Sequence, residues 1–327
     1  MDSLVHDSSL TDARGPLVTV VTPTFNRAVL LEATIRSVRA QAYPNIEHLV
    51  VDGGSTDGTV ALLRRYEGTY GLRWTSEPDG GMYSAINKGL QQGRGEIQAY
   101  LNSDDLYFPW TIRIVVDAFV RHPEADVIFG DVMDIDDWTG RMKPAWNLPF
   151  DLDYLRRTGF MWQPGVFWRK GVFEGAGGFD ETIRYGADLE FWLRLGARDT
   201  CFVKINEFLA VARQHPETLS LVHRPRVIEE LTGIRAKHVP RPGRQRPWVR
   251  TSDRLRRPLY ARAYWLGLLL QSLVPARLRR GPWSEFLGAG QTKISYLAVV
   301  LRPIPGLGRR VAGPLLRPSR HWLQPPG

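Results

Sequence analysis

The sequence has little that would suit an exported or membrane-spanning protein. It holds one cysteine, Cys201, among 327 residues, so it lacks a disulfide framework and a reducing compartment is expected. Its first residues are polar and lack the basic start and apolar run of a signal peptide. The longest apolar stretch, 263–276, is shorter than the roughly 20 residues that a membrane-spanning helix needs. We therefore expect a cytoplasmic protein.

Acidic residues are scarce in the last third of the chain. Residues 1–220 hold 22 Lys and Arg against 30 Asp and Glu, a net charge of −8, whereas residues 221–327 hold 21 against 4, a net charge of +17. Short apolar stretches bordered by arginine favour an anionic membrane surface as the partner, at the inner face. An ordinary helical subdomain with a solvated basic face is the alternative. Nucleic acid is not expected as a partner, because the tail shows no recognisable nucleic-acid module.

The first 220 residues alternate between short apolar runs and amphipathic stretches. The apolar runs predict strands, and apolar residues three and four apart predict helices. The expected strands are 17–22, 46–51, 72–75, 97–101, 126–133 and 202–212. The expected helices are one that Asn26 caps and that runs through Ala42, one that ends at Tyr66, and those at 82–92, 111–120 and 187–195. This order predicts the α/β class, with a mostly parallel, Rossmann-like sheet flanked by helices.

Acidic residues follow three of these strands. Asp52 and the pair Asp104-Asp105 end strands directly, and Asp79 lies in a Pro-Asp-Gly turn after a third. Ligands of such sheets bind beyond the carboxyl ends of the strands, so we expect these acids in one cleft. Two adjacent carboxylates suit Mg²⁺ or Mn²⁺ bound together with a diphosphate. Solvated turns are the alternative, because aspartate is also common there.

Five motifs occur in a recognisable order. They are Thr22-Pro23-Thr24-Phe25-Asn26-Arg27, Asp52-Gly53-Gly54-Ser55-Thr56-Asp57-Gly58-Thr59, Glu77-Pro78-Asp79-Gly80-Gly81-Met82-Tyr83, Asn102-Ser103-Asp104-Asp105, and Gly178-Phe179-Asp180-Glu181 before Ala187-Asp188-Leu189-Glu190-Phe191-Trp192-Leu193-Arg194. Together they resemble the family 2 inverting glycosyltransferases, which use nucleotide sugars and have the GT-A fold. The expected division is an N-terminal tail (1–16), a GT-A domain (17–220) and a basic, helical, membrane-associated extension (221–327).

The resemblance implies roles for individual residues. Asp188 matches the catalytic base. A divalent cation, Mn²⁺ or Mg²⁺, is expected at Asp105 and Asp104, with Asp105 the more direct ligand and His215 a further candidate. A loop histidine without a ligand is equally expected at His215. The residues expected to bind the nucleotide or donor are Pro23, Thr24, Asn26, Arg27, Asp52, Ser55, Asp79, Lys88 and Asp104.

The acceptor side is expected around the tryptophan-rich stretch that precedes the last motif. Trp162 and Gln163 lie where such enzymes build this side, although Trp162 is as readily a core residue. Arg169 is expected to steer an anionic acceptor, such as a lipid-linked diphosphate.

Asp188 starts a predicted helix, whose dipole favours the ionised carboxylate.

The expected function is a metal-dependent, inverting transfer of a sugar from a nucleoside diphosphate to an acceptor hydroxyl, in polysaccharide or glycolipid synthesis. The carbohydrate or lipid-linked acceptor, the sugar and the nucleotide stay open. A sugar-phosphate nucleotidyltransferase or a dehydrogenase would need a glycine-rich loop where Pro23 to Arg27 stand. A membrane-docked scaffold that has lost its activity is the non-enzymatic alternative.

Overall fold

The computed structural model describes residues 15–157 and 161–238. The chain divides into two units, Met1–Asp134 with Pro144–Arg241, and Ile135–Lys143 with Pro242–Gly327. Most of the basic extension expected from 221 onward lies outside the described residues. Within the described ranges, no helix combines the length and apolarity needed to cross a bilayer.

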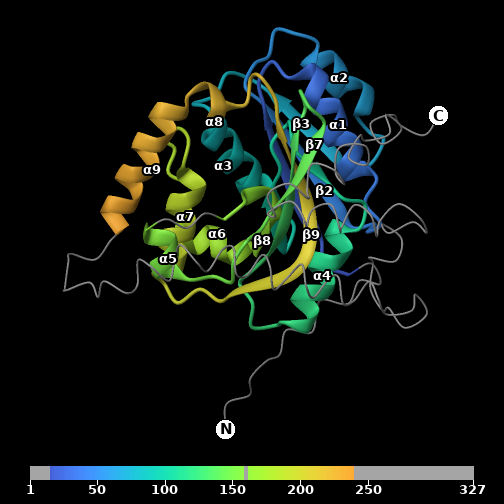
Figure 1. Cartoon of the computed structure of the whole chain (residues 1–327). Helices are drawn as coiled ribbons and strands as arrows, with labels where there is room; N and C mark the ends of the chain where they lie inside the picture. Colours follow the sequence, from blue (N-terminus) through green and yellow to red (C-terminus); the bar gives the residue numbers. More distant parts are fainter. Residues whose placement is uncertain (1–14, 158–160, 239–327) are drawn as a thin grey trace, which may run out of the picture. The chain divides into compact units, whose positions relative to one another are not determined.

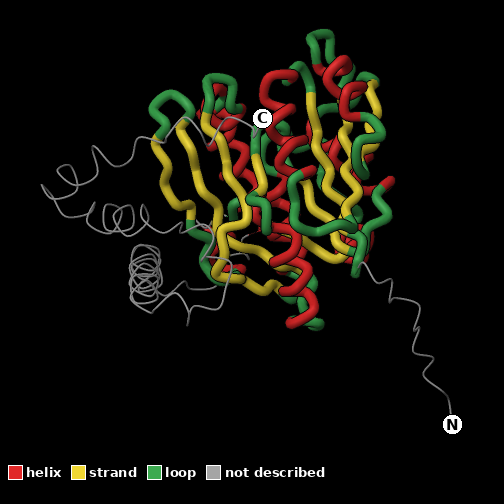
Figure 2. Tube along the Cα trace, turned by 90° about the vertical axis from the view of Figure 1, so that its right-hand side faces the viewer, coloured by secondary structure: helices red, strands yellow, loops and turns green. Residues whose placement is uncertain are grey.

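Helices cover a mixed β-sheet (Figures 1 and 2). The helices are α1 (Ala28–Arg39), α2 (Thr59–Tyr66), α3 (Met82–Gln92), α4 (Thr111–Arg121), α5 (Leu152–Arg157), the 3₁₀ turn η1 (Gln163–Gly165), α6 (Lys170–Ala176), α7 (Ala187–Gly196), α8 (Leu219–Val222) and α9 (Arg224–His238). The strands are β1 (Val18–Thr24), β2 (Ile46–Asp52), β3 (Leu72–Ser76), β4 (Ile97–Tyr100), β5 (Leu106–Tyr107), β6 (Val127–Asp136), β7 (Arg141–Ala145), β8 (Val166–Arg169) and β9 (Phe202–Gln214).

Only part of the sheet is parallel. Its order is β3-β2-β1-β4-β8-β6-β9-β5, with β7 beside β6, and β3, β2, β1 and β4 pair in parallel. Strand β8 is antiparallel to both β4 and β6, and β5 is antiparallel to β9. Since β8 lies between two strands of the same direction, the expectation of a mostly parallel sheet holds for its first half only. Hydrophobic periodicity predicts strands but not which strands become neighbours.

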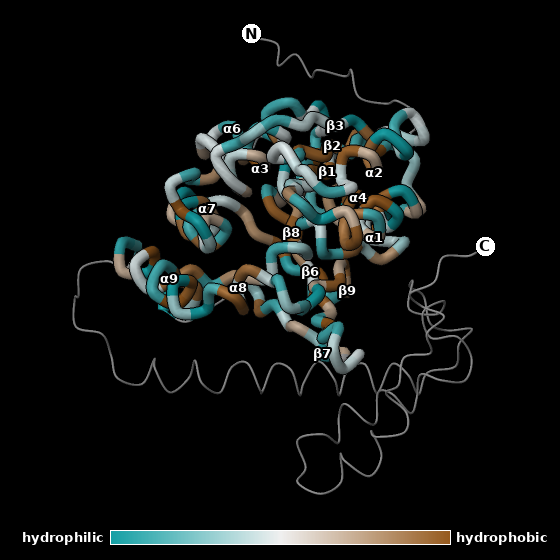
Figure 3. The backbone as a smooth tube through the Cα atoms, turned by 90° about the horizontal axis from the view of Figure 1, so that it is seen from above, coloured by the Kyte–Doolittle hydropathy of each residue, from teal (hydrophilic) through white to brown (hydrophobic). Residues whose placement is uncertain are grey.

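The core has two sides because side chains alternate along each strand. On β1, Val20 packs with the α4 side, whereas Val21 packs with α3, α6 and α7. Figure 3 shows the hydrophobic strands β1, β2 and β8 between these two groups of helices. The largest fully buried side chains, Trp168 and Trp192, belong to the α7 side, which therefore supports the helix that carries Asp188.

The sequence prediction at the first helix was partly wrong. Helix α1 begins at Ala28 with Arg27 as its N-cap, and it ends before Ala42. Asn26 does not cap it but adopts a left-handed conformation, with φ of 52°. Asparagine tolerates this conformation better than most residues, and the loop after β2 uses its side chain, as described below.

Gly71 lies so close to the backbone of Ile46 that a substitution there tests the parallel pairing of β2 with β3. A Cβ atom added at Gly71 would lie 2.2 Å from the carbonyl oxygen of Ile46, which is backbone and cannot rotate away. We expect Gly71→Ala to destabilise the protein by about 2–3 kcal/mol, because overpacking forces backbone shifts. Chemical denaturation measures this loss. Gly175→Ala is the control, since no atom lies within 4 Å of its added Cβ, and equal stability of the two variants would contradict the register.

Candidate active site

The parallel strands bring the predicted acids to one edge of the sheet. Asp52 is the last residue of β2, and the Asp104-Asp105 pair follows β4, on either side of β1. Three buried side-chain oxygens at this edge form no hydrogen bond within the described part of the chain: Thr24 Oγ1, Asn102 Oδ1 and Gln163 Oε1. Buried polar atoms are normally paired, so these three oxygens are available to a polar ligand at this edge.

Asp52 is fully buried and organises the turn that follows it. Its carboxylate accepts hydrogen bonds from the backbone N–H of Ser55 at 3.0 Å and from the hydroxyl groups of Ser55 and Ser76, the latter at 2.6 Å. Because three hydrogen bonds join this carboxylate to Ser55 and Ser76, Asp52 positions the loop between β2 and α2.

The loop after β1 is tied to the loop after β2. The backbone N–H of Asn26 donates to Ser55 Oγ at 2.7 Å, and Asn26 Oδ1 accepts from the N–H of Thr56 at 2.8 Å. Arg27 pairs with the carboxylate of Glu217, just after β9. Asn26, Arg27 and Ser55 therefore hold one edge of the site together.

Asp79 packs against Gly53 of the second motif. It accepts a hydrogen bond from the backbone N–H of Gly81 at 2.8 Å, and an added Cβ at Gly53 would lie 3.0 Å from Asp79 Oδ2. An acidic side chain at position 53 would crowd a second negative charge against Asp79. The glycine at 53 thus accommodates Asp79. Lys88, predicted to meet a phosphate, forms an ion pair with Glu77.

Asp104 contacts His215, which comes from the end of β9. The distance from His215 Nε2 to Asp104 Oδ2 is 2.9 Å, and the N–H of Glu217 donates to His215 Nδ1 at 3.3 Å. His215 is therefore a hydrogen-bond partner of Asp104 in this arrangement, and its role as a ligand of a cation stays a prediction.

Asp105 lies behind Asp104. Its side chain is buried and accepts a hydrogen bond from the N–H of Arg213 at 3.2 Å. Burial, followed by the neighbouring charge of Asp104, raises the pKa of Asp105 well above its usual range. The side chain of Asp104 is 23% exposed and is the more accessible of the two.

Asp188 occupies the first turn of α7. Its Oδ1 accepts a hydrogen bond from the N–H of Leu189 at 2.8 Å. The expectation that the helix start would favour the ionised form is wrong in its net effect. Burial, together with a smaller effect of the charge of Glu230, raises the pKa of Asp188 to about 6, against the lowering effect of the backbone hydrogen bonds. A carboxylate with a pKa closer to neutrality is a stronger base near pH 7.

Two buried tyrosines connect Asp188 with the aspartate pair. The hydroxyl of Tyr83 donates to the carbonyl oxygen of Tyr185 at 3.3 Å, just before α7, and interacts with the charge of Asp188. Tyr100 is hydrogen bonded to Tyr83 and is influenced by the charges of both Asp188 and Asp105. Burial raises the pKa of both tyrosines well above 10, so they remain neutral. Tyr83 belongs to the third motif, but the sequence pattern assigned it no role.

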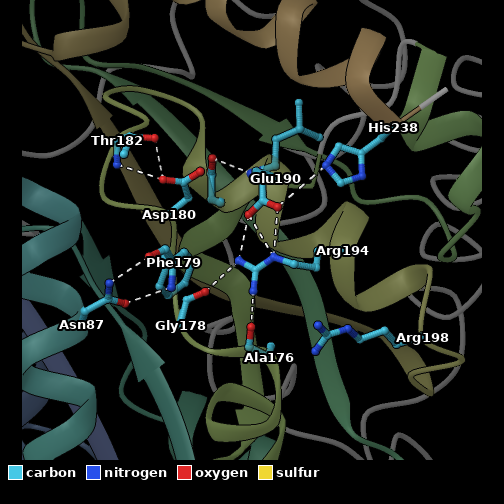
Figure 4. Close-up of polar contacts among 12 residues, drawn as sticks. Asn87, Ala176, Gly178, Phe179, Asp180, Thr182, Glu190, Arg194, Arg198 and His238 are labelled. Atoms are coloured by element: carbon cyan, nitrogen blue, oxygen red, sulfur yellow. Dashed lines mark hydrogen bonds and ion pairs between the residues drawn. The ribbon is translucent and has the colours of Figure 1, made fainter.

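The loop before α7 is held by polar contacts from two helices (Figure 4). Asn87 of α3 bonds both the N–H of Phe179, at 2.9 Å, and its carbonyl oxygen, at 2.8 Å. Arg194 of α7 donates to the carbonyl oxygens of Ala176 and Gly178, the latter at 2.7 Å. The segment that leads to Asp188 is thus fixed from both sides.

The predicted acceptor residues separate into two groups. Gln163 Nε2 donates to the carbonyl oxygen of Tyr100 at 2.6 Å, which places it at the acidic edge. Trp162 is half-buried beside it and packs against the core. Arg169 was wrongly predicted to belong here, because it pairs with Ile97 at the opposite end of β4 and donates to the carbonyl oxygen of Ala125.

The carboxylates at this edge suit a cation whose remaining ligands come from a bound substrate. Across residues 15–157 and 161–238, no three His, Cys, Asp or Glu side chains converge as a ready-made metal site. Mg²⁺ commonly takes one or two carboxylates together with substrate phosphates, and Asp104 with Asp105 behind it matches this smaller set.

This α/β architecture, with acids beyond its parallel strands and a carboxylate on α7, defines a GT-A-fold glycosyltransferase. The model of the family "Glycosyl transferase family 2" matches residues 19–174. Uncharacterized glycosyltransferase Rv1514c of Mycobacterium tuberculosis (strain ATCC 25618 / H37Rv) is 34% identical over 183 residues, 55% of this chain and 69% of that protein. The chain therefore belongs to glycosyl transferase family 2, and the expected family and fold class are confirmed.

Other similar proteins share less of their length or sequence. A PGL/p-HBAD biosynthesis glycosyltransferase of Mycobacterium bovis (strain BCG / Pasteur 1173P2) is 31% identical over 144 residues, 43% of this chain and about half, 54%, of that protein. The crystal structure of S. aureus TarS 1-349 in complex with UDP-GlcNAc has a TM-score of 0.58 at 16% identity and covers 90% of this chain and 82% of that one. Mannosyltransferase PcManGT from Pyrobaculum calidifontis, in complex with GDP-Man and Mn2+, has a TM-score of 0.54 at 22% identity, covering 88% and 86%. At these identities, the two structures support the fold alone.

Proposed function

We propose that the protein transfers a sugar from a nucleoside diphosphate to an acceptor hydroxyl with inversion at the anomeric carbon, aided by a divalent cation. The observation that carries this proposal is that the raised-pKa carboxylate of Asp188 and the buried carboxylate of Asp105, next to Asp104, both act on the buried Tyr100, which is hydrogen bonded to Tyr83. One acid is suited to the leaving diphosphate and the other to the attacking hydroxyl. The hexosyl character of the sugar is part of the same proposal.

In the proposed reaction, Asp188 takes the proton of the acceptor hydroxyl and the nucleoside diphosphate is the leaving group. The acceptor hydroxyl gives its proton to Asp188 as its oxygen forms a bond to the anomeric carbon. The bond between that carbon and the diphosphate oxygen breaks, and the electron pair leaves with the nucleoside diphosphate. Attack from the face opposite the diphosphate inverts the configuration. A divalent cation held by Asp104 and Asp105 would supply Lewis-acid stabilisation of the charge on the diphosphate.

The donor pocket would lie over the loops that follow β1 and β2. Thr24 offers a buried, unpaired hydroxyl within the described residues, and the loops held by Asn26 and Asp52 frame it. Pro23, Arg27, Ser55 and Asp79 complete this edge, whereas Lys88 would have to leave Glu77 to meet a phosphate.

We extend the proposal to the acceptor and the place of action. The M. bovis relative is named for PGL/p-HBAD biosynthesis, and the extension carries the +17 charge of residues 221–327. A glycolipid or polysaccharide acceptor at an anionic membrane surface, on the cytoplasmic side, is consistent with both. Gln163 and Trp162 would face this acceptor.

A thermal-shift panel tests the donor site. UDP, GDP, dTDP and CDP are each added with Mn²⁺ and with EDTA. A nucleotide at about 100 times its Kd stabilises the folded state by about 2.7 kcal/mol, so one nucleotide should raise the melting temperature clearly, and only with the metal. Adenosine diphosphate serves as a specificity control. Failure of all four nucleotides to shift the melt would contradict the donor assignment and favour a scaffold without activity.

A further inference from the structure

Helix α9 packs against the start of α7, the helix that carries Asp188 (Figure 1). A Cβ atom added at Gly186, the N-cap of α7, would lie 2.5 Å from Leu231 Cδ2 and 3.0 Å from Ile234 Cδ1. Ile234 is 4% exposed. The glycine therefore allows a close contact between the two helices at the point where α7 begins.

Glu230 of α9 adds hydrogen bonds to this contact between the two helices. Its Oε1 accepts hydrogen bonds from the N–H groups of Tyr185 at 2.6 Å and Gly186 at 2.9 Å, and its Oε2 accepts from the N–H of Arg184 at 2.9 Å. Backbone N–H groups at a helix start lack partners within the helix, and hydrogen bonds to an ionised acceptor are stronger than neutral ones. One carboxylate thus holds three consecutive backbone groups that lead into α7.

The other end of α9 also meets α7. His238 Nε2 lies 3.7 Å from Glu190 Oε1, and Glu190 is paired with Arg194, which anchors the preceding loop (Figure 4). Directly before α9, the ring of His223 lies 5.6 Å from that of Tyr185. Contacts on both sides of Glu230 therefore fix the orientation of α9 relative to α7.

We propose that Glu230 is a positioning residue for the transfer reaction, which fixes the backbone that presents Asp188 and makes α9 part of the active site. This inference rests on the proposed role of Asp188 as the base. It extends the active site beyond residue 220, where the resemblance to known motifs ends.

The charge of Glu230 gives this role a measurable signature. The titratable groups that face Asp188 from neighbouring elements are Tyr83 of α3, Tyr100 of β4 and Glu230 of α9, and Glu190 and Arg194 lie further along α7 itself. Burial is the main cause that raises the pKa of Asp188, and because both tyrosines remain neutral, Glu230 contributes the negative charge that raises this pKa as well. Removal of that charge should lower the pKa of Asp188, which a purely structural role elsewhere would not do.

Three variants separate charge from geometry. Glu230→Gln can keep the bonds to Oε1 but loses the charge, so the acid limb of the kcat profile should move down by about half a pH unit, with a nearly normal plateau. Glu230→Ala loses the anchor, so the plateau kcat should fall roughly 10- to 100-fold while the KM for the donor changes little. Glu229→Gln, at an exposed neighbouring position, is the matched control and should behave as the unchanged protein.

A direct titration keeps this test independent of the reaction. Carbon-13 NMR of the aspartate carboxyl groups, with the Asp188 signal assigned by its loss in Asp188→Asn, should show the lower pKa in Glu230→Gln. Full plateau kcat in folded Glu230→Ala, or an unchanged Asp188 titration in Glu230→Gln, would overturn the proposal. If Asp188→Asn remained active, the base assignment would fail instead, whatever the NMR titration showed.

Discussion

Asp188→Asn should remove nearly all sugar transfer while the protein still binds its donor. Removal of a general base typically costs 10² to 10⁴ in rate, so we expect kcat to fall roughly 1000-fold. The substitution keeps a side-chain oxygen that can accept the hydrogen bond from Leu189. Nucleotide affinity should therefore change little, because the proposed donor site lies beyond β1, β2 and β4.

The same variant should be more stable than the unchanged protein at alkaline pH. The folded-state pKa of Asp188, about 6, is above its ordinary value of 3.8. A raised pKa of an acid means that the folded state binds the proton more tightly than the unfolded chain. Stability from this group is therefore lost as the pH rises from about 4 to about 6. Asparagine does not titrate, so the loss is absent in Asp188→Asn. The melting temperature of this variant at pH 8 should therefore be higher than that of the unchanged protein.

The pH profile of the unchanged protein provides the second measurement. Asp188 must be ionised to accept a proton, so kcat should rise with pH through about 6 and then level off. Asp199→Asn, at an exposed position beyond the other end of α7, is the matched control and should retain full activity. Near-normal turnover by Asp188→Asn would exclude this carboxylate as the base.

Asp104→Asn should remove the metal dependence of donor binding and most of the turnover. The asparagine oxygen can still accept the hydrogen bond from His215, which is 2.9 Å long with aspartate. The substitution therefore removes the negative charge of Asp104 but keeps its contact with His215. A cation at a transferring diphosphate supplies several kcal/mol, so we expect kcat/KM to fall roughly 100- to 1000-fold.

Titration calorimetry with the nucleotide selected by the thermal-shift panel measures the binding part. Affinity in the presence of Mn²⁺ should fall to the level seen with EDTA. Asp117→Asn, on the exposed face of α4, is the control for removing one negative charge and should leave both values unchanged. Metal-dependent binding of normal strength in folded Asp104→Asn would show that the cation is held elsewhere.

The sequence alone was enough to locate most of the elements and the family. The apolar runs of β1, β2 and β4 and the amphipathic pattern of α3 are local signals, and the structure places these elements close to the predicted bounds. The acids after the strands follow from the same signals, because parallel neighbours bring their carboxyl ends to one edge. Motifs of this kind are contiguous in the sequence, so they need no knowledge of the fold to be seen.

The tertiary structure decided what depends on distant partners. Arg169 follows a tryptophan-rich motif in the sequence, yet the antiparallel register of β8 places it beside Ile97, away from the acids. The pKa of Asp188 depends on burial and on Glu230, which is 42 residues away in the sequence, so the local helix dipole predicted the wrong direction. Desolvation and hydrogen bonding act through space, and only the packing of α9 on α7 reveals which side chain anchors the proposed base.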